Sequence, residues 1–320
     1  MARTEAVALR REATAAAWWR INATALLFMG PALLLVLVFF LAPVVITFTM
    51  SLTDLATSTG LSNWQWIGLE NFARIFRSQF WLTILGNTVV YVAVVLAFNV
   101  LVGLGVALLT MHMEPKAGGV FRALWLLPRI SPSVVYALLW VWAAASPPFG
   151  MLNYIVAPFG LEQRFWLQSD PWLIVILING FVGASFGMLI FTSAIKAIPE
   201  DLFRAARVDG ASALQIVRRI TLPLIKWPIL FVLVYQTMSL FASYEYIYLT
   251  TNGGPGLYAT ETWSLWAFHT ALSNYYGNLE FAYGAAMSAI LVLMGLAISI
   301  VLLRVFRFGQ LVAEPRVEVE

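Results

Sequence analysis

Six long apolar segments are the feature of this chain that most restricts its fold. A helix needs roughly 20 apolar residues to cross the ~30 Å of hydrocarbon in a bilayer. The segments run approximately from Ala25 to Phe48, Thr83 to Leu109, Val120 to Val141, Trp172 to Ile195, Ile229 to Leu249 and Phe281 to Leu303. They are continuously apolar, whereas the strands of a membrane barrel alternate polar and apolar side chains. The predicted fold class is therefore an all-α polytopic membrane protein with six transmembrane helices.

The composition agrees with a membrane protein and excludes several other classes. Of 320 residues, 61% are hydrophobic and 11% are charged, whereas an ordinary globular domain is about 25% charged. The net charge of +3 is too small an excess to indicate a nucleic-acid partner. Because the sequence has no cysteine, disulfides and thiolate metal sites are excluded. The first apolar segment follows a long charged leader without an obvious cleavage site, so we expect it to be retained.

The distribution of lysine and arginine predicts the orientation in the membrane. With the N-terminus inside, the inner segments hold fifteen of these cations and the outer loops hold only Arg74, Arg77 and Arg164. This positive-inside bias places both termini in the cytoplasm. The expected organisation is a cytoplasmic N-terminal segment 1–24, one six-helix membrane domain 25–305 with a cytoplasmic loop 196–227, and a cytoplasmic tail 306–320.

No enzyme signature is present in the sequence. The two histidines, His112 and His269, are predicted on opposite sides of the membrane, which argues against a two-histidine metal site or dyad. The chain has no G-x-x-x-x-G-K-[ST] phosphate loop. If transport is driven by ATP, the hydrolysis must therefore occur on a separate chain, and we expect no cofactor or metal on this one.

The cytoplasmic loop 196–227 is a long polar insertion predicted to form two short helices. Pro199 suits the first position of a helix that ends near Asp209, and the acidic Glu200 and Asp201 suit the positive end of its dipole. Glu200 also lies four residues before Arg204, in the order that supports a helix.

A glycine separates the two predicted helices of this loop. Gly210 can adopt the left-handed conformation that ends the first helix, and Ser212 can cap a second helix from Ala213 to about Ile220, which Pro223 closes. The small side chains of Ala205 and Ala206 allow close entry into a groove. The loop is therefore either a docking surface for a partner or a solvated loop that contacts anionic lipids.

Arg129 is a charged residue inside the third apolar segment, and it lies between Pro128 and Pro132. A charge at this depth requires a partner or a water-filled cavity. Two interpretations stay open: the arginine caps the carbonyls freed by the prolines or pairs with Glu245, or it contacts a polar or anionic solute.

The fifth apolar segment carries a run of polar and aromatic residues, namely Gln236, Tyr244, Glu245, Tyr246 and Tyr248. Aromatic faces can stack on sugar rings, and carboxylates and amides can hydrogen-bond hydroxyl groups, so this run suits a polyhydroxylated solute. Tyrosines are also ordinary residues of the membrane interface. The candidate residues of the solute path are Arg129, Gln236, Tyr244, Glu245 and Tyr248.

The motifs of the cytoplasmic loop resemble the EAA loop of ABC importer permeases. The resemblance rests on Ala205 and Ala206, on Gly210 four residues later, and on Ile220, Leu222 and Pro223 beyond it. Residues 208–211 (VDGA) and the outer-loop residues 249–255 (LTTNGGP) resemble the sugar-type branch related to the maltose permeases. The resemblance extends over nearly the whole chain, from about Leu26 to Leu303.

The resemblance implies a transmembrane permease subunit of an ATP-driven, binding-protein-dependent importer for a sugar or oligosaccharide in the bacterial inner membrane. Its implied partners are a second homologous permease, a dimer of ATPase subunits that holds ATP and Mg, and an extracytoplasmic solute-binding protein. The implied ATPase-coupling residues are Glu200, Arg204, Ala205, Ala206, Asp209 and Gly210. Arg204 occupies the position at which the family usually has a glutamate, so docking is expected to depend on shape, with Glu200 and Asp209 as the remaining acids.

Two alternatives remain. The same machine could import an anionic sugar or polyol, such as a phosphorylated glycerol or a sulfonated or acidic glycoside, and Arg129 motivates that interpretation. From a different class, an ion-coupled secondary transporter is also compatible with the apolar segments.

Overall fold

The computed structural model describes residues 25, 27–273 and 277–306. The predicted segment 1–24 lies outside the described residues, and of the predicted tail 306–320 only Phe306 is described. Within the described ranges the chain is helical, with a single isolated antiparallel bridge between Thr53 and Trp66. The predicted all-α class is confirmed.

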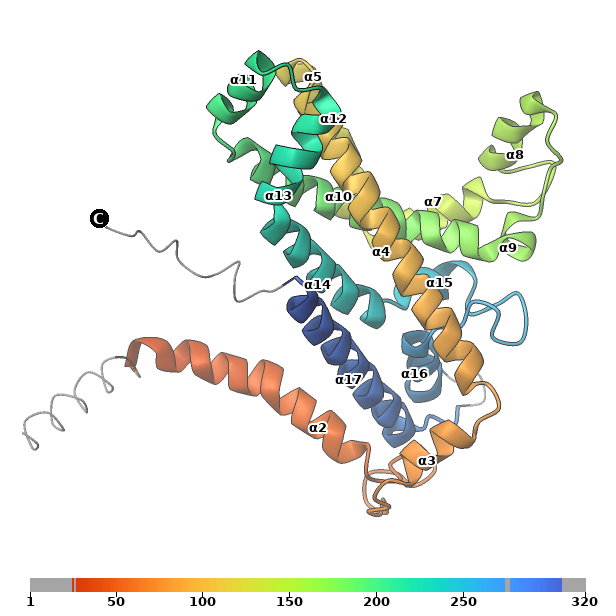
Figure 1. The fold of residues 1–320 in the computed structure, drawn as a ribbon. Coiled ribbons are helices and arrows are strands. Elements are labelled where there is room, and N and C mark those ends of the chain that lie inside the picture. The colour runs from red at the N-terminus through yellow and green to blue at the C-terminus, as the bar shows by residue number, and fades with distance from the viewer. Residues whose placement is uncertain (1–24, 26, 274–276, 307–320) are drawn as a thin grey trace, which may run out of the picture.

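Within the described residues, four unbroken helices are long and apolar enough to cross a membrane. They are Leu27–Met50, α4 (Trp81–Met111), α10 (Pro171–Lys196) and α17 (Phe281–Val305). The first of these contains η1 (Leu37–Leu41) and α2 (Ala42–Met50), and it stands apart from the other helices except at its outer end (Figure 1). Two further pairs of helices meet the same test only when each bent pair is counted as one span, which gives up to six spans. These pairs are Pro115–Ile130 with Ser133–Ala143 and Ala213–Leu224 with Lys226–Ala242.

The shorter helices lie in the loops and in the two bent pairs. They are α3 (Glu70–Arg77), α5 (Pro115–Trp125), α6 (Leu127–Ile130), α7 (Ser133–Ala143), α8 (Met151–Val156), η2 (Ala157–Phe159), α9 (Trp166–Ser169), α11 (Glu200–Val208), α12 (Ala213–Ile216), η3 (Val217–Thr221), α13 (Leu222–Leu224), α14 (Lys226–Ala242), α15 (Glu245–Thr250) and α16 (Trp263–Ala271).

The third predicted segment is not one straight helix. The chain bends by 99° between Pro115–Ile130 and Ser133–Ala143. Pro132 has no N–H to continue the helical ladder and disfavours helical geometry in the residue before it. Ser131 is accordingly extended, with ψ 141°, and α7 leaves at a new angle.

The fifth predicted segment is also interrupted, because α14 ends at Ala242 rather than continuing to Leu249. Ser243 is extended, with φ −77° and ψ 112°. Its carbonyl accepts a hydrogen bond of 2.9 Å from Ser264 Oγ, and its hydroxyl accepts one of 2.9 Å from Asn179 Nδ2. These side chains satisfy polar groups at the break, which makes the interruption tolerable inside a membrane protein.

The predicted cytoplasmic loop forms its two helical parts, with small differences in their ends. Pro199 precedes α11 as its N-cap instead of being its first residue, and Gly210 has the expected positive φ of 75°. Ser212 forms a reciprocal capping box with Gln215. The second part passes through the π-helix η3 and does not end at Pro223, because the path turns at Ile225.

The most extensive helix contact among the described residues joins α4 and α10, and it includes small residues. A Cβ atom added at Gly103 would lie 2.8 Å from the Ala184 carbonyl oxygen and 2.9 Å from the Met188 nitrogen. Small residues that let two backbones approach are a common basis of helix packing in membranes. Residues of α10 line one of the cavities described below, and residues of both helices line another.

We predict that Gly103→Ala destabilises the protein by about 1–3 kcal/mol, because the new methyl group meets backbone atoms that cannot rotate away. Gly105→Ala is the matched control, since a Cβ at Gly105 has no atom within 4 Å outside its own helix. Thermal unfolding of the two purified variants checks this. Equal unfolding temperatures would contradict the assigned contact.

Candidate functional site

A cavity of about 360 Å³, which we call the central cavity, lies where the two interrupted segments meet α10. It is lined by residues of α6, α10, α14 and α15 and of the break between the last two helices. Arg129, Gln236, Tyr244 and Glu245 all line it. The structure therefore brings together four of the five residues that the sequence proposes for the solute path.

Tyr248 does not line the central cavity. Its ring centroid lies 5.1 Å from that of Phe268 and 5.9 Å from that of His269. Tyr244, one helical turn before Tyr248, packs on the same ring of Phe268, with centroids 4.5 Å apart, but only Tyr244 also lines the cavity. The assignment of Tyr248 to the solute path stays a prediction.

Arg129 lies over an aromatic ring and is not paired with an acid. Its guanidinium carbon is 4.8 Å from the centroid of Phe186, a cation–π contact. Among the described residues, neither a salt bridge from Arg129 to Glu245 nor a hydrogen bond from Arg129 to a carbonyl freed by the prolines is present. Glu245 instead accepts a hydrogen bond from Ser133 Oγ. The cavity therefore contains one cation and one anion that do not neutralise each other by direct contact.

The remaining polar groups of the cavity are held by buried hydrogen bonds. Gln236, which is 4% exposed, donates from Nε2 to the Gly183 carbonyl over 2.8 Å. Asn179 joins α10 to the break in the fifth segment through Ser243. Because these amides are fixed, the cavity presents its hydrogen-bonding groups in set positions.

The predicted coupling residues all lie on α11 or on the turn that follows it. Arg204 pairs with Glu200 over 3.1 Å and approaches Asp201 at 3.9 Å, and all three side chains are exposed. Such exposed pairs within one helix contribute only about 0.3–0.5 kcal/mol. Ala205 is exposed, Ala206 is half-buried, and Asp209 caps the helix before Gly210. Within α11, the charge of Arg204 is thus partly balanced by its own helix.

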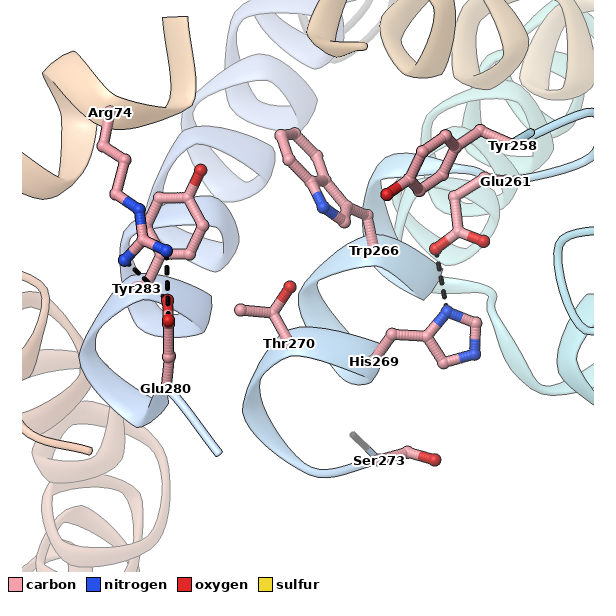
Figure 2. Close-up of a pocket in the computed structure, with 9 residues that line it drawn as sticks. All are labelled: Arg74, Tyr258, Glu261, Trp266, His269, Thr270, Ser273, Glu280 and Tyr283. Carbon is pink, nitrogen blue, oxygen red and sulfur yellow. Dashed lines mark hydrogen bonds and ion pairs between the residues drawn. The ribbon is translucent and has the colours of Figure 1, made fainter. Parts of the chain in front are cut away.

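A second cavity, of about 350 Å³, which we call the outer pocket, lies among residues of α3, α16 and the start of α17 (Figure 2). Arg74 forms an ion pair of 2.6 Å with Glu280 and lies 4.2 Å above the ring of Tyr283. The hydrogen bond and negative charge of Glu280 raise the pKa of Arg74 above its ordinary value, against a smaller opposing effect of burial. Arg74 is therefore a fixed positive charge on one side of the pocket.

On the other side of the outer pocket, His269 contacts both the buried Glu261 and Asn252 in a turn. Its Nδ1 lies 2.9 Å from Oε1 of Glu261, which is 3% exposed, and its Nε2 lies 2.9 Å from Oδ1 of Asn252 (Figure 2 shows the contact with Glu261). The sequence assigned no common role to Glu261, Glu280 and His269. The structure brings them into one pocket, although no group of three acids or histidines in the described ranges has the arrangement of a metal site.

Two of these arrangements have little signal in the sequence. Ser133 lies in an apolar segment that also contains Arg122, Arg129 and Ser131, and it is 112 positions away from Glu245. The outer pocket combines loops that lie about 200 residues apart, at Arg74 and Glu280. For the pairing of Ser133 with Glu245, the one available signal was that Ser133 directly follows Pro132, where the helix breaks.

Comparisons with known proteins assign the fold and a family. Residues 99–319 match the family described as "Binding-protein-dependent transport system inner membrane component". The chain is 32% identical over 281 residues, 87% of this chain and 92% of the relative, to the trehalose/maltose transport system permease protein MalF of Thermococcus litoralis. It is 29% identical over 237 residues, 71% of this chain and 56% of the relative, to the galactooligosaccharides transport system permease protein GanP of Bacillus subtilis.

Among solved structures, the chain resembles a bacterial ABC transporter involved in the import of the acidic polysaccharide alginate. The TM-score is 0.75 and the identity 24%, and the match covers 91% of this chain and 98% of the other. At this level of identity the likeness supports the fold alone.

Proposed function

Because the chain belongs to the family of binding-protein-dependent transport system inner membrane components, we propose that it is the permease subunit of an ATP-driven importer for a sugar or oligosaccharide. The observation that carries the sugar assignment is the similarity along 87% of the chain to a trehalose/maltose permease. The chain contributes part of the translocation path, and ATP hydrolysis takes place on a separate ATPase.

The proposed assembly contains this chain, a second homologous permease, two ATPase subunits that bind ATP and Mg, and an extracytoplasmic solute-binding protein. The positive-inside distribution of lysine and arginine supports cytoplasmic termini and a cytoplasmic α11. In this assembly α11 seats in a cleft of the ATPase. ATP can move α11 only if the two docked states of the assembly differ in affinity, because a ligand shifts an equilibrium only by its differential affinity for the two states.

The central cavity is the proposed solute path of this subunit. Tyr244 offers an aromatic face, and Gln236 and Glu245 offer oxygen acceptors. Arg129 and Glu245 carry opposite charges at the same cavity, which favours a neutral polyhydroxylated solute over an anionic one. An anionic sugar stays the alternative that Arg129 motivates. An ion-coupled secondary transporter is not favoured by the family.

The proposed function predicts ATP-dependent uptake of sugars by the assembled complex in proteoliposomes. With ATP inside and the solute-binding protein outside, maltose, trehalose or galactooligosaccharide should accumulate, and an ATPase variant without hydrolysis should abolish this uptake. Anionic sugars in the same panel should compete weakly. Uptake that persists with the inactive ATPase and follows an ion gradient would refute the proposal.

We predict that Glu245→Gln lowers sugar uptake by roughly 10- to 100-fold, the size expected when a hydrogen bond to a charged group worth about 1.5–3 kcal/mol is lost. Uptake is measured at saturating solute-binding protein and equal expression. Arg129→Gln should reduce the uptake of an anionic solute more than that of a neutral one. Tyr248→Phe is the control outside the cavity and should transport like the wild type, whereas unchanged uptake by Glu245→Gln would contradict the solute-path assignment.

A further inference from the structure

A third cavity, of about 380 Å³, lies under the cytoplasmic loop and has no role in the proposed transport cycle. We call it the coupling cavity, because α11 forms part of its wall. Its apolar walls come from α4, α10, α11, α12 and η3, through Leu108, Met111, Ile195, Phe203, Ile216 and Val217. The cavity therefore lies between the inner ends of two membrane helices and both parts of the loop.

The position of the coupling cavity corresponds to the level of lipid headgroups. The helix α4 ends at Met111 and α10 ends at Lys196, and residues of both ends line or adjoin the cavity. Ends of spanning helices lie where the hydrocarbon gives way to the polar headgroups. A ligand there can have one part at the polar level and another between apolar side chains.

The charges at the coupling cavity favour an anion. Arg207 and His112 line it, and none of its lining residues is acidic. His112 Nδ1 donates to the Leu108 carbonyl over 2.8 Å, which fixes the ring at the end of α4. Arg207 forms no salt bridge among the residues that the structure describes, although Arg204 on the same helix pairs with Glu200 over 3.1 Å. Arg207 thus keeps an uncompensated positive charge at the cavity.

We propose that the coupling cavity binds an anionic phospholipid of the inner leaflet. The phosphate lies against Arg207 and His112, and part of an acyl chain occupies the space between the apolar walls. A free phosphate would use Arg207 and His112 and leave the apolar walls in contact with water, which is unfavourable. Anionic lipids are concentrated on the cytoplasmic side, where basic side chains attract them.

The bound lipid connects the coupling helix to the membrane helices. Phe203 and Arg207 belong to α11, whereas Leu108 and His112 belong to the end of α4. A lipid that contacts both restrains the position of α11 relative to α4. The lipid composition of the membrane therefore affects how α11 transmits movement between the ATPase and the helices.

Native mass spectrometry of the whole transporter complex, released from nanodiscs of phosphatidylcholine and phosphatidylglycerol, tests this proposal. The wild type should retain phosphatidylglycerol in preference to phosphatidylcholine. Arg207→Gln should lower the affinity for phosphatidylglycerol about fivefold, the size expected for one arginine near an anionic surface. Arg204→Gln is the matched control on the same helix and should retain the lipid as the wild type does.

A second variant fills the cavity without changing its charge. Ala213 lines the cavity at the first, exposed position of α12, so Ala213→Trp should occupy the acyl-chain space and also reduce phosphatidylglycerol retention. All comparisons use the mass of the intact complex, so a variant that fails to assemble is recognised. If a variant fails in this way, His112→Gln is measured in its place. Equal retention by Arg207→Gln and Arg204→Gln would overturn the proposal. Displacement of the lipid by soluble glycerol phosphate would show a phosphate site and would equally overturn the lipid assignment.

Discussion

The interruption of two membrane-level helices is the constraint on which the rest of the structure depends. A backbone polar group inside a bilayer has no water to bond, so a break is possible only where the protein supplies partners. At the fifth segment Ser264 supplies one to the carbonyl of Ser243, whose hydroxyl accepts a hydrogen bond from Asn179. The helices that follow the two breaks, α7 and α15, are connected by the hydrogen bond from Ser133 to Glu245. The same breaks thus create the central cavity and position Glu245 in its wall.

The helix α10 connects this cavity with the cytoplasmic loop. Asn179 lies at the central cavity and Ile195 lies at the coupling cavity, 16 positions later on one unbroken helix. At a rise of 1.5 Å per residue this corresponds to about 24 Å. Because α10 packs closely on α4 at Gly103, the proposed displacement of α11 would be carried toward the central cavity by this pair as a nearly rigid unit.

The sequence predicted the features that depend on local chemistry. Apolar length located the four unbroken spans but not the bends in the third and fifth segments. Gly210 and Ser212 located the ends of the loop helices, because a left-handed cap and an N-cap act within a few residues. The break at Ser243, the pairing of Ser133 with Glu245 and the outer pocket around His269 were not predicted. Each depends on contacts between segments that are far apart in the sequence, and a single polar residue in an apolar run does not identify its partner.

The central claim is that α11 seats in a separate ATPase and drives transport from there. The chain contains no cysteine, so Ala206→Cys gives it a single thiol for crosslinking within the assembled complex, and Leu61→Cys on the outer loop is the control. Crosslinking of Ala206→Cys to the ATPase, with loss of ATP-driven sugar uptake and no crosslink from Leu61→Cys, is the predicted result. Failure of Ala206→Cys to reach any ATPase subunit in a complex that still transports would contradict the account.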